Sequence, residues 1–435
     1  MIRIVLIRHG HTAWNSAEGQ GQRFRGLTDL PLADEGVAQA QATARRLSQL
    51  PVDAIYTSPL QRAVRTAQIL AEPHHLVVQV VSGLSSMSYG DWAGLLNTDV
   101  ARRWPELYEQ WSHDPFGVQI PGGDNTTNLR ERAVRAVHEV LARHSGGACV
   151  VLVSHEAVCR TLMCALGGLP NQDYWRIRQG LCNLTTFDYD PAGNQFTLIE
   201  MNDTCHLEPS LPQAAAPPGR GLRARDGTRV VLIRHGQTAW NQSAGEERFR
   251  GRTDLPLDNV GLGQAMALAG RLRSEPIAAL YASPLTRARQ TIAPLAEELG
   301  LPVQSHDGLL DIDYGGFQGL THQEAAAAYP DQYALWRSTP GHVHFPGGES
   351  LADVRGRVLG LLDELTARKP VACATFKTVA LVGHQMVNKV AVCALLDLGL
   401  DQIWRIQQDT CGIDVFQQVD GAWHTLRLND TCHLR

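Results

Sequence analysis

The chain carries a tandem repeat, and this repeat constrains its fold more than any other feature. Residues 4–15 return as residues 230–241, and the histidines within them, His9 and His235, are 226 positions apart (235 − 9). Later motifs return in the same order: Ser58-Pro59-Leu60 as Ser283-Pro284-Leu285, His155 as His384, and residues 202–207 as 429–434. A repeat of this length spans a whole domain, so the sequence predicts two domains with the same fold.

The stretch between the two copies is rich in proline and glycine. Residues 209–228 contain four prolines and three glycines, a composition that favours an exposed linker over a helix or an inner strand. We therefore place the first domain at residues 1–208, the linker at 209–228 and the second domain at 229–435. The 435 residues agree with two domains, since one domain usually takes about 100–200 residues.

The composition excludes several classes of protein. Hydrophobic residues make up 44% of the chain and charged residues 19%, which is too apolar for a disordered chain. The formal charge of −5, without a long basic block, gives no reason to expect nucleic acid or a membrane surface as a partner. No apolar run approaches the ~20 residues of a membrane helix, and the N-terminus has no signal-peptide pattern. We expect a cytoplasmic, soluble protein whose nine cysteines are mostly reduced and buried.

Apolar runs and helical patterns alternate within each copy. The patterns of the first copy predict strands at 2–7, 53–57 and 149–153, helices at 35–49 and 126–144, further helices after Ser58 and from His155, and a final hairpin around 190–194. Ser58 followed by Pro59 is typical of a helix N-cap and first helical position. The alternation predicts two tandem three-layer α/β/α domains, each a mostly parallel sheet with helices on both faces.

Repeated polar residues follow the predicted strand ends. In such sheets ligands bind beyond the carboxyl ends of the strands, so we expect these side chains to converge there. They are Arg8, His9, Arg62 and His155 in the first copy and Arg234, His235, Arg287 and His384 in the second. Two arginines and two histidines beside helix N-termini fit a phosphoryl dianion.

A histidine placed among arginines can also act as a nucleophile. Neighbouring positive charge lowers the pKa of the imidazole and keeps it neutral, so that it can take a phosphoryl group as a covalent intermediate. The second histidine and the arginines would stabilise the charge of the phosphoryl group in transit. The leaving alkoxide then needs a proton donor, normally a carboxylic acid with a raised pKa.

Together these motifs resemble the histidine phosphatase superfamily, in its phosphoglycerate mutase-like branch, over nearly all of both copies. The residues that carry the resemblance are Arg-His-Gly-x-Thr-x-x-Asn at 8–15 and 234–241, Gly-x-x-Asp-Leu-Pro-Leu at 26–32 and 251–257, Ser-Pro-Leu-x-Arg-Ala at 58–63 and 283–288, Pro-Gly-Gly at 121–123 and 346–348, and the late Val-x-His. The resemblance implies the phosphoglycerate mutase-like fold in both domains, a phosphorylated nucleophile at His9 or His235, and a phosphate pocket that includes Asn15 or Asn241. It implies that Arg8, Arg62 and His155, or Arg234, Arg287 and His384, hold the phosphoryl group, and it implies no metal and no organic cofactor.

The two copies differ at the position of the family's proton donor, an acid three residues before a Tyr-Gly pair. The second copy has Asp311 there, where Glu is usual, and the first copy has Ser86. A serine hydroxyl is too weak an acid for this role near neutral pH, and loss of the donor typically costs ~10²–10⁴ in rate. Asp91 and Glu18 are the alternative acids of the first copy. We expect the second domain to be the active phosphatase and the first to be degenerate.

The spacing of the motifs favours hydrolysis over phosphoryl retransfer. His9 and His155 are 146 positions apart and His235 and His384 are 149 apart, whereas the mutases that the chain resembles carry longer insertions here. We expect a metal-independent hydrolase of small acidic or sugar phosphomonoesters that works through a phosphohistidine. Phosphoglycerate mutase-type transfer is the first alternative. A non-catalytic first domain that binds a phosphate ligand or acts as a pseudo-dimer partner is the second.

Three further features bear on substrate and assembly. Arg25 and Arg250 stand where the family commonly has Gln, which indicates a second anionic group on the substrate or, equally, a surface arginine paired with Glu246 or Glu247. Two aromatic sets with helical spacing should pack a helix onto its own domain, with one or two members at the pocket mouth: Trp104, Tyr108, Trp111 and Tyr329, Tyr333, Trp336. Domains of this family often pair, so an intramolecular pseudo-dimer or a homo-oligomer is possible.

Overall fold

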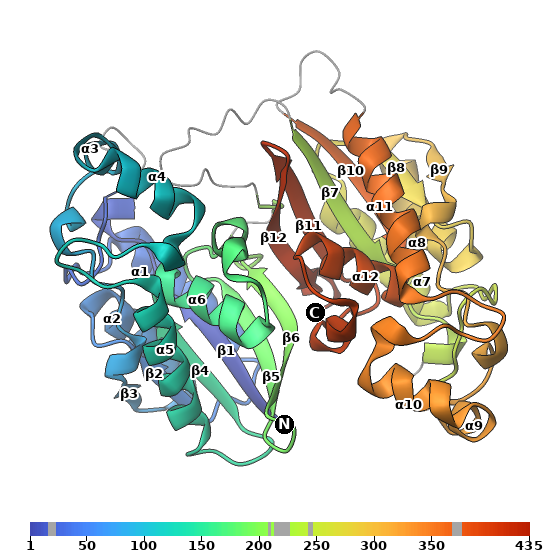
Figure 1. Cartoon of the computed structure of the whole chain (residues 1–435), viewed down its shortest axis with the longest axis horizontal. Coiled ribbons are helices and arrows are strands. Elements are labelled where there is room, and N and C mark those ends of the chain that lie inside the picture. Colours follow the sequence, from blue (N-terminus) through green and yellow to red (C-terminus); the bar gives the residue numbers. More distant parts are fainter. Residues whose placement is uncertain (16–22, 208–209, 213–226, 242–246, 368–375) are drawn as a thin grey trace. The chain divides into compact units, whose positions relative to one another are not determined.

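The computed structural model describes residues 1–15, 23–207, 210–212, 227–241, 247–367 and 376–435. The described residues up to 207 belong to one compact unit and those from 227 onward to a second (Figure 1). The predicted linker at 209–228 lies mostly outside the described residues, and the first strand of the second unit already begins at Gly227.

The first unit is built on a sheet with the strand order β3-β2-β4-β1-β5-β6. Its strands are β1 (Ile2–Arg8), β2 (Ala54–Thr57), β3 (Val78–Val80), β4 (Cys149–Ser154), β5 (Leu184–Asp190) and β6 (Gln195–Asp203). Its α-helices are α1 (Asp34–Leu47), α2 (Gln61–Ala71), α3 (Asn97–Arg103), α4 (Pro105–His113), α5 (Thr126–Leu141) and α6 (Glu156–Gly167). Strands β1 to β4 pair in parallel, and β5 and β6 add an antiparallel hairpin beside β1.

The second unit repeats this sheet in the order β9-β8-β10-β7-β11-β12. Its strands are β7 (Gly227–Arg234), β8 (Ile277–Ala282), β9 (Val303–Ser305), β10 (Phe376–Gly383), β11 (Ile413–Val419) and β12 (Ala422–Asp430). Its α-helices are α7 (Asn259–Leu272), α8 (Thr286–Leu299), α9 (His322–Ala328), α10 (Pro330–Ser338), α11 (Leu351–Ala367) and α12 (Gln385–Leu395). Strands β7 to β10 again pair in parallel, and β11 and β12 are antiparallel.

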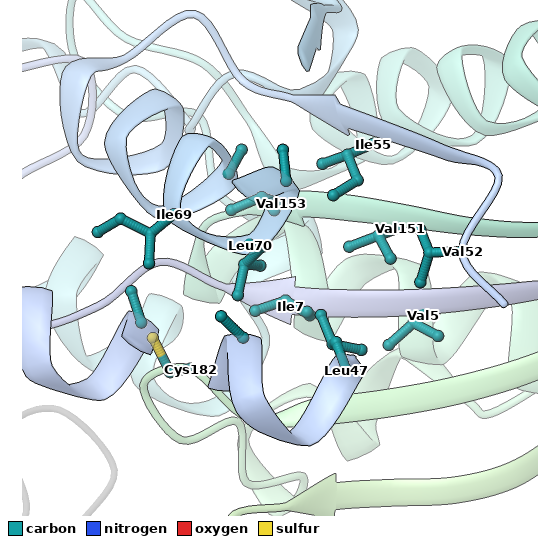
Figure 2. Packing of buried hydrophobic residues seen from close by; sticks show 14 of the residues in the cluster. Val5, Ile7, Leu47, Val52, Ile55, Ile69, Leu70, Val151, Val153 and Cys182 are labelled. Carbon is teal, nitrogen blue, oxygen red and sulfur yellow. The ribbon is translucent and has the colours of Figure 1, made fainter. Parts of the chain in front are cut away.

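Helices cover both faces of the first sheet. On one face, Val5 of β1 and Val151 of β4 meet Leu47 of α1 and Leu70 of α2 in one apolar cluster (Figure 2). Alternate strand residues point to opposite faces, so the equally buried Leu152 and its neighbours face the other way, where α5 and α6 contact each other. Because both faces are buried, these strands are apolar throughout. The predicted fold class is confirmed.

Two predicted helix boundaries were wrong in detail. Helix α2 begins at Gln61 with Leu60 at its N-cap, not with Ser58 as the cap. The hydroxyl of Ser58 instead contacts a histidine ring that follows a neighbouring strand. Helix α5 ends at Leu141, three residues before the predicted end, and the chain then turns toward Gly147, whose φ of +94° suits glycine.

Two expectations from the sequence, the absence of a membrane helix and reduced, buried cysteines, can be compared with the described residues. Among their helices, none has both the length and the apolarity that crossing a bilayer requires. The eight cysteines among them are free thiols, and six of these are buried. Cys373 lies outside the described residues.

Replacement of Gly315 by alanine tests the loop between β9 and α9. Gly315 has φ +49°, and a Cβ there would clash with the carbonyl oxygen of Pro346, so the backbone would have to shift. We expect Gly315→Ala to lower the free energy of unfolding by ~3 kcal/mol and the urea midpoint of the second unit by ~1 M. Gly263→Ala is the matched control, because Gly263 lies in α7 with open space around it and alanine there should raise the midpoint. An unchanged midpoint for Gly315→Ala would contradict this loop geometry.

Candidate functional site

Neighbouring parallel strands deliver the repeated polar residues to one edge of each sheet. The last residues of β7 and β10 are in register, so His235 and His384 follow adjacent strand ends, with their ring centroids 5.1 Å apart. Ser283 follows β8, which is paired with β10. The same register in the first unit places His9 and His155 with ring centroids 5.2 Å apart. The predicted convergence of the histidines is therefore present in both units.

The imidazole of His235 has a defined tautomer. Its Nδ1 lies 2.6 Å from the carbonyl oxygen of Gly236, which only accepts, so Nδ1 carries the proton and Nε2 carries the lone pair. The ring is buried, and burial together with Arg287, Arg234 and Arg250 holds the pKa of His235 well below its ordinary value. A neutral ring with a free Nε2 lone pair is a competent nucleophile.

The guanidinium of Arg287 is oriented by backbone carbonyls. Its Nη1 and Nη2 donate to the carbonyl oxygens of Thr253 and Gly251, each at 2.8 Å, and its Nε donates to Nδ1 of His384 at 3.1 Å. Asp254 accepts from the first backbone N–H of α8 at 2.7 Å and so ties the same loop to the helix that carries Arg287. The Gly-x-x-Asp motif thus positions the arginine, a role that its sequence did not reveal.

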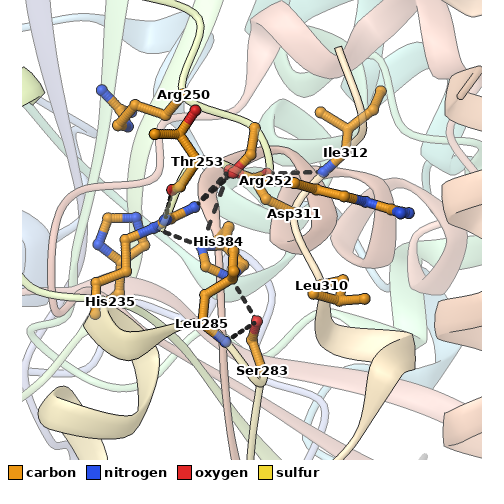
Figure 3. Close-up of polar contacts among 12 residues, drawn as sticks. His235, Arg250, Arg252, Thr253, Ser283, Leu285, Leu310, Asp311, Ile312 and His384 are labelled. Atoms are coloured by element: carbon orange, nitrogen blue, oxygen red, sulfur yellow. Dashed lines mark hydrogen bonds and ion pairs between the residues drawn. The ribbon is translucent and has the colours of Figure 1, made fainter. Parts of the chain in front are cut away.

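Ser283 fixes the second histidine. Since Nδ1 of His384 accepts from Arg287, its Nε2 carries the proton and donates to Ser283 Oγ at 2.8 Å (Figure 3). The pKa of His384 is held well below its ordinary value by burial and by Arg287. Ser58 makes the equivalent contact with His155 at 2.7 Å. The sequence pattern predicted a helix cap at Ser58 and did not reveal this contact for either serine, although their position directly after a strand is a signal for it.

Asp311 is the carboxyl group of the second site. Its Oδ2 lies 3.3 Å from Nη2 of Arg287 and 3.9 Å from Nδ1 of His384, and its Oδ1 accepts from the backbone N–H of Ile312 at 3.0 Å (Figure 3). Burial outweighs the attraction of Arg287 and Arg250 and raises the pKa of Asp311. A buried carboxyl with a raised pKa beside His384 can hold a proton and give it up.

Ser86 occupies the equivalent place in the first unit. Arg132 donates to the carbonyl oxygen of Ser86 at 3.1 Å, as Arg357 donates to that of Asp311 at 3.2 Å, so the two loops are anchored alike. Ser86 is 5% exposed and lines the first pocket. The alternative acid Asp91 is not among the lining residues, and Glu18 lies outside the described residues.

The first unit, which lacks this carboxyl group, also has a hydrogen bond to His9 that has no counterpart at His235 among the described residues. Arg62 rests on two loop carbonyls as Arg287 does, but its Nε donates to Nε2 of His9 at 3.2 Å. His9 also contacts the carbonyl oxygen of Gly10 through Nδ1 at 2.7 Å, so both ring nitrogens are engaged. Nδ1 of His155 has no partner among the described residues. The lone pair that is free in the second unit is thus occupied in the first.

Glu156 is a pocket residue that the sequence motifs did not single out. It lines the first pocket, and its two carboxylate oxygens each lie 2.9 Å from an arginine, one from Arg8 and one from Arg160. These arginines lower the pKa of Glu156 to about 2 against the effect of burial, so it is ionised and a poor proton donor. The second unit has Gln385 at this position, directly after its second histidine.

Of the remaining predicted site residues, the arginines line the pockets and the asparagines do not. Arg25 lines the first pocket and Arg250 the second. Arg250 is 7% exposed, so it is not a surface arginine, although Glu247 lies 3.8 Å from it; Glu246 lies outside the described residues. Asn15 and Asn241 are absent from the pocket linings; each accepts hydrogen bonds from a threonine of its own turn, Thr12 or Thr238.

Aromatic side chains form one wall of each pocket. Trp111 and Trp336 are both buried and both line their pockets, in contact with Trp175 and Trp404 respectively. Trp104 and Tyr329 stand at the N-caps of α4 and α10, so the predicted sets begin at a helix start. The tryptophans therefore serve as helix packing and as pocket wall at once.

One family model matches both halves of the chain, and the similar proteins include phosphatases. The model of the histidine phosphatase superfamily (branch 1) matches residues 4–204 and 230–431. Phosphoserine phosphatase 1 of Hydrogenobacter thermophilus is 34% identical over 206 residues, which cover 47% of this chain and 94% of that protein. The 2-carboxy-D-arabinitol-1-phosphatase of Triticum aestivum is 26% identical over 433 residues, which cover 96% of this chain and 83% of that protein. A mycobacterial glucosyl-3-phosphoglycerate phosphatase, solved with inorganic phosphate, is 28% identical with a TM-score of 0.43 and covers 48% of this chain and all of that chain.

The protonation state of His235 can be read directly by NMR. Because Nδ1 donates to a carbonyl and positive charge surrounds the ring, we expect His235 to remain the neutral Nδ1–H tautomer from pH 8 down to pH 6. Long-range ¹H–¹⁵N correlation spectra of the ring, assigned with a His235→Gln variant, make the measurement. The chain unfolded in urea is the control, in which histidines should titrate near ~6.5. A charged His235 ring at pH 6 in the folded protein would show that the geometry is misread.

Proposed function

Because the chain belongs to the histidine phosphatase superfamily (branch 1) and is a phosphatase of that type, we propose that its second unit is the active phosphomonoester hydrolase. The observation that carries this proposal is the difference between the two units at one loop position. Asp311 provides a buried carboxyl group with a raised pKa in the second unit, and Ser86 provides none in the first. Both units keep the two arginines and two histidines of the motifs: Arg8, Arg62, His9 and His155 in the first and Arg234, Arg287, His235 and His384 in the second.

The first chemical step is transfer of the phosphoryl group to His235. Its Nε2 lone pair attacks phosphorus, and the P–O bond to the leaving alkoxide breaks as the N–P bond forms. Arg234, Arg287 and His384 are the groups that would stabilise the charge on the phosphoryl oxygens. Asp311 gives its proton to the leaving oxygen, so the alcohol departs neutral and Asp311 becomes a carboxylate.

The second step returns the enzyme to its starting state. Water attacks the phosphorus of phosphohistidine, the N–P bond breaks, and the Asp311 carboxylate takes the proton of the attacking water. Inorganic phosphate leaves, His235 regains its lone pair, and Asp311 is again protonated. The proposed cycle uses no metal ion, so EDTA should leave the rate unchanged.

We propose small phosphomonoesters that carry a second anionic group as substrates. Arg250 is buried and lines the pocket with Glu247 at 3.8 Å, and its guanidinium supports this proposal as a partner for an anionic group other than the phosphoryl group. The names of two relatives support this class, because phosphoserine and 2-carboxy-D-arabinitol 1-phosphate each contain a carboxylate. The short spacing between His235 and His384 favours hydrolysis over mutase-type retransfer.

For the first unit we propose binding of phosphate ligands without efficient turnover. Its pocket keeps Arg62, His9 and His155, which supports binding. Two features oppose catalysis there: the absence of a carboxyl proton donor at Ser86 and the hydrogen bond from Arg62 to Nε2 of His9. A pseudo-dimer role of this unit would be compatible with such binding.

Single alanine substitutions of the two nucleophile candidates test the division between the units. We expect His235→Ala to reduce the hydrolysis of p-nitrophenyl phosphate by ~10⁴-fold or more, because it removes the group that accepts the phosphoryl. His9→Ala is the matched variant in the first unit and should retain most of the wild-type kcat. If His9→Ala instead abolishes most hydrolysis, the assignment of the units is reversed.

The role of Asp311 predicts both a leaving-group effect and a pH effect. Asp311→Asn should lower kcat/KM by ~10²–10⁴-fold for an alkyl phosphate, and far less for p-nitrophenyl phosphate, whose leaving group needs no proton. In the wild type, activity on the alkyl ester should fall as pH rises through the raised pKa of Asp311, because only the protonated form donates. This alkaline fall should be absent in Asp311→Asn. Equal losses on both substrates would remove Asp311 from the proton-donor role.

A further inference from the structure

Lys389 is a buried cation that makes no ion pair with a described acid, although Asp409 and Glu247 act on it from a greater distance. It lies on α12, five residues after His384, and is 5% exposed. Its ammonium group stands 5.2 Å from the ring centre of Trp404, and among the described residues it makes no ion pair and no hydrogen bond. A buried charge that lacks a partner costs free energy, so its presence calls for a ligand or another role.

In the first unit, the cation at the equivalent position is Arg160, and a carboxylate neutralises it. Arg160 there lines the pocket and pairs with Glu156 at 2.9 Å, and Glu156 also pairs with Arg8 at 2.9 Å. The second unit keeps a cation at both arginine positions, Lys389 and Arg234, but replaces the carboxylate by Gln385. The carboxylate at this position of the first pocket is therefore missing from the second, whose lining acid near the cations is Glu247, 3.8 Å from Arg250.

The space next to Lys389 belongs to the substrate pocket. Gln385 of the same helix and Trp404, on whose ring Lys389 rests, both line this pocket. Arg250 lines it as well, and the buried Nε–H groups of Arg234 and Arg250 have no hydrogen-bond partner among the described residues. Arg234 acts electrostatically on both Lys389 and Arg250, so three buried cations lie in the part of the second unit that corresponds to the surroundings of Glu156 in the first.

We propose that Lys389, with Arg250, forms a subsite for a carboxylate of the substrate, next to the site of the phosphoryl group. The substrate carboxylate would take the place that Glu156 fills in the first unit, so the two units would differ in whether this subsite is open. This inference rests on the proposed hydrolase function of the second unit and adds the residue that selects its substrates. Lys389 is a specificity-determining residue in this scheme and takes no part in the bond-breaking steps.

The surroundings of Lys389 predict how binding should depend on pH. Arg234, Cys393, Asp409 and Glu247 are the charged or titratable groups that act on it, and burial and Arg234 lower its pKa to about 8. The ammonium is therefore charged at pH 7 and lost above about pH 8, whereas an arginine would keep its charge. The preference for a carboxylated substrate should weaken over that range in the wild type and persist in Lys389→Arg.

A matched pair of substrates isolates the subsite. 3-Phosphoglycerate and glycerol 3-phosphate differ by a carboxylate in place of a hydroxymethyl group. We expect the wild type to prefer 3-phosphoglycerate, and Lys389→Met to reduce the ratio of the two kcat/KM values by ~10–100-fold, mainly through KM for 3-phosphoglycerate. Lys389→Arg should restore the ratio. Gln385→Glu, which recreates the carboxylate of the first unit, should lower it as Lys389→Met does.

Controls separate this inference from the proposed function. Arg289→Met removes an exposed cation from α8 of the same unit and should change neither substrate's kinetics. Thermal unfolding of Lys389→Met should show a fold at least as stable as the wild type, because an unpaired buried charge has been removed. If the full-length protein hydrolyses both substrates and Lys389→Met leaves their ratio unchanged, the subsite is overturned and the hydrolase function stands. If the wild type hydrolyses neither substrate nor p-nitrophenyl phosphate, the proposed function itself fails.

Discussion

The guanidinium of Arg287 is the group on which the second site depends. It is held by the carbonyl oxygens of Gly251 and Thr253, and it donates to His384 and to Asp311. Arg287 therefore connects three parts of the second unit: the loop after β7, helix α8 and the loop that carries Asp311. Without Asp311, the same arginine arrangement in the first unit turns its Nε toward the nucleophile candidate instead. The two units thus differ both in this carboxyl group and in the histidine that the arginine Nε contacts.

The duplication made much of this predictable from the sequence. Strand runs such as Val150–Val153, followed by a polar residue, located both histidines at neighbouring strand ends, because parallel strands share one carboxyl edge. The contrast between Ser86 and Asp311 was visible because the two copies could be compared position by position. The fold class followed from the alternation of apolar runs and helical patterns.

Residues whose role depends on a contact distant in the sequence could not be found in this way. Ser283 has the local pattern of a helix cap, and only the register of β8 with β10 brings it to His384. Glu156 and Lys389 lie on inward faces of helices. The sequence pattern of such a helix does not reveal whether a charged residue forms an ion pair or faces a ligand subsite. Only the structure distinguishes them: Glu156 pairs with two arginines at 2.9 Å in the first unit, whereas Lys389 in the second unit makes no ion pair with a described residue.

The central claim is that phosphoryl transfer occurs at His235 and not at His9. The most direct test is to mix the full-length protein with ³²P-labelled substrate, to quench within milliseconds into alkali, where phosphohistidine persists, and to map the label by peptide mass spectrometry. The account predicts label on the peptide that contains His235, at a level that follows the approach to steady state. Label confined to the His9 peptide, or turnover without labelled histidine under these conditions, would contradict it.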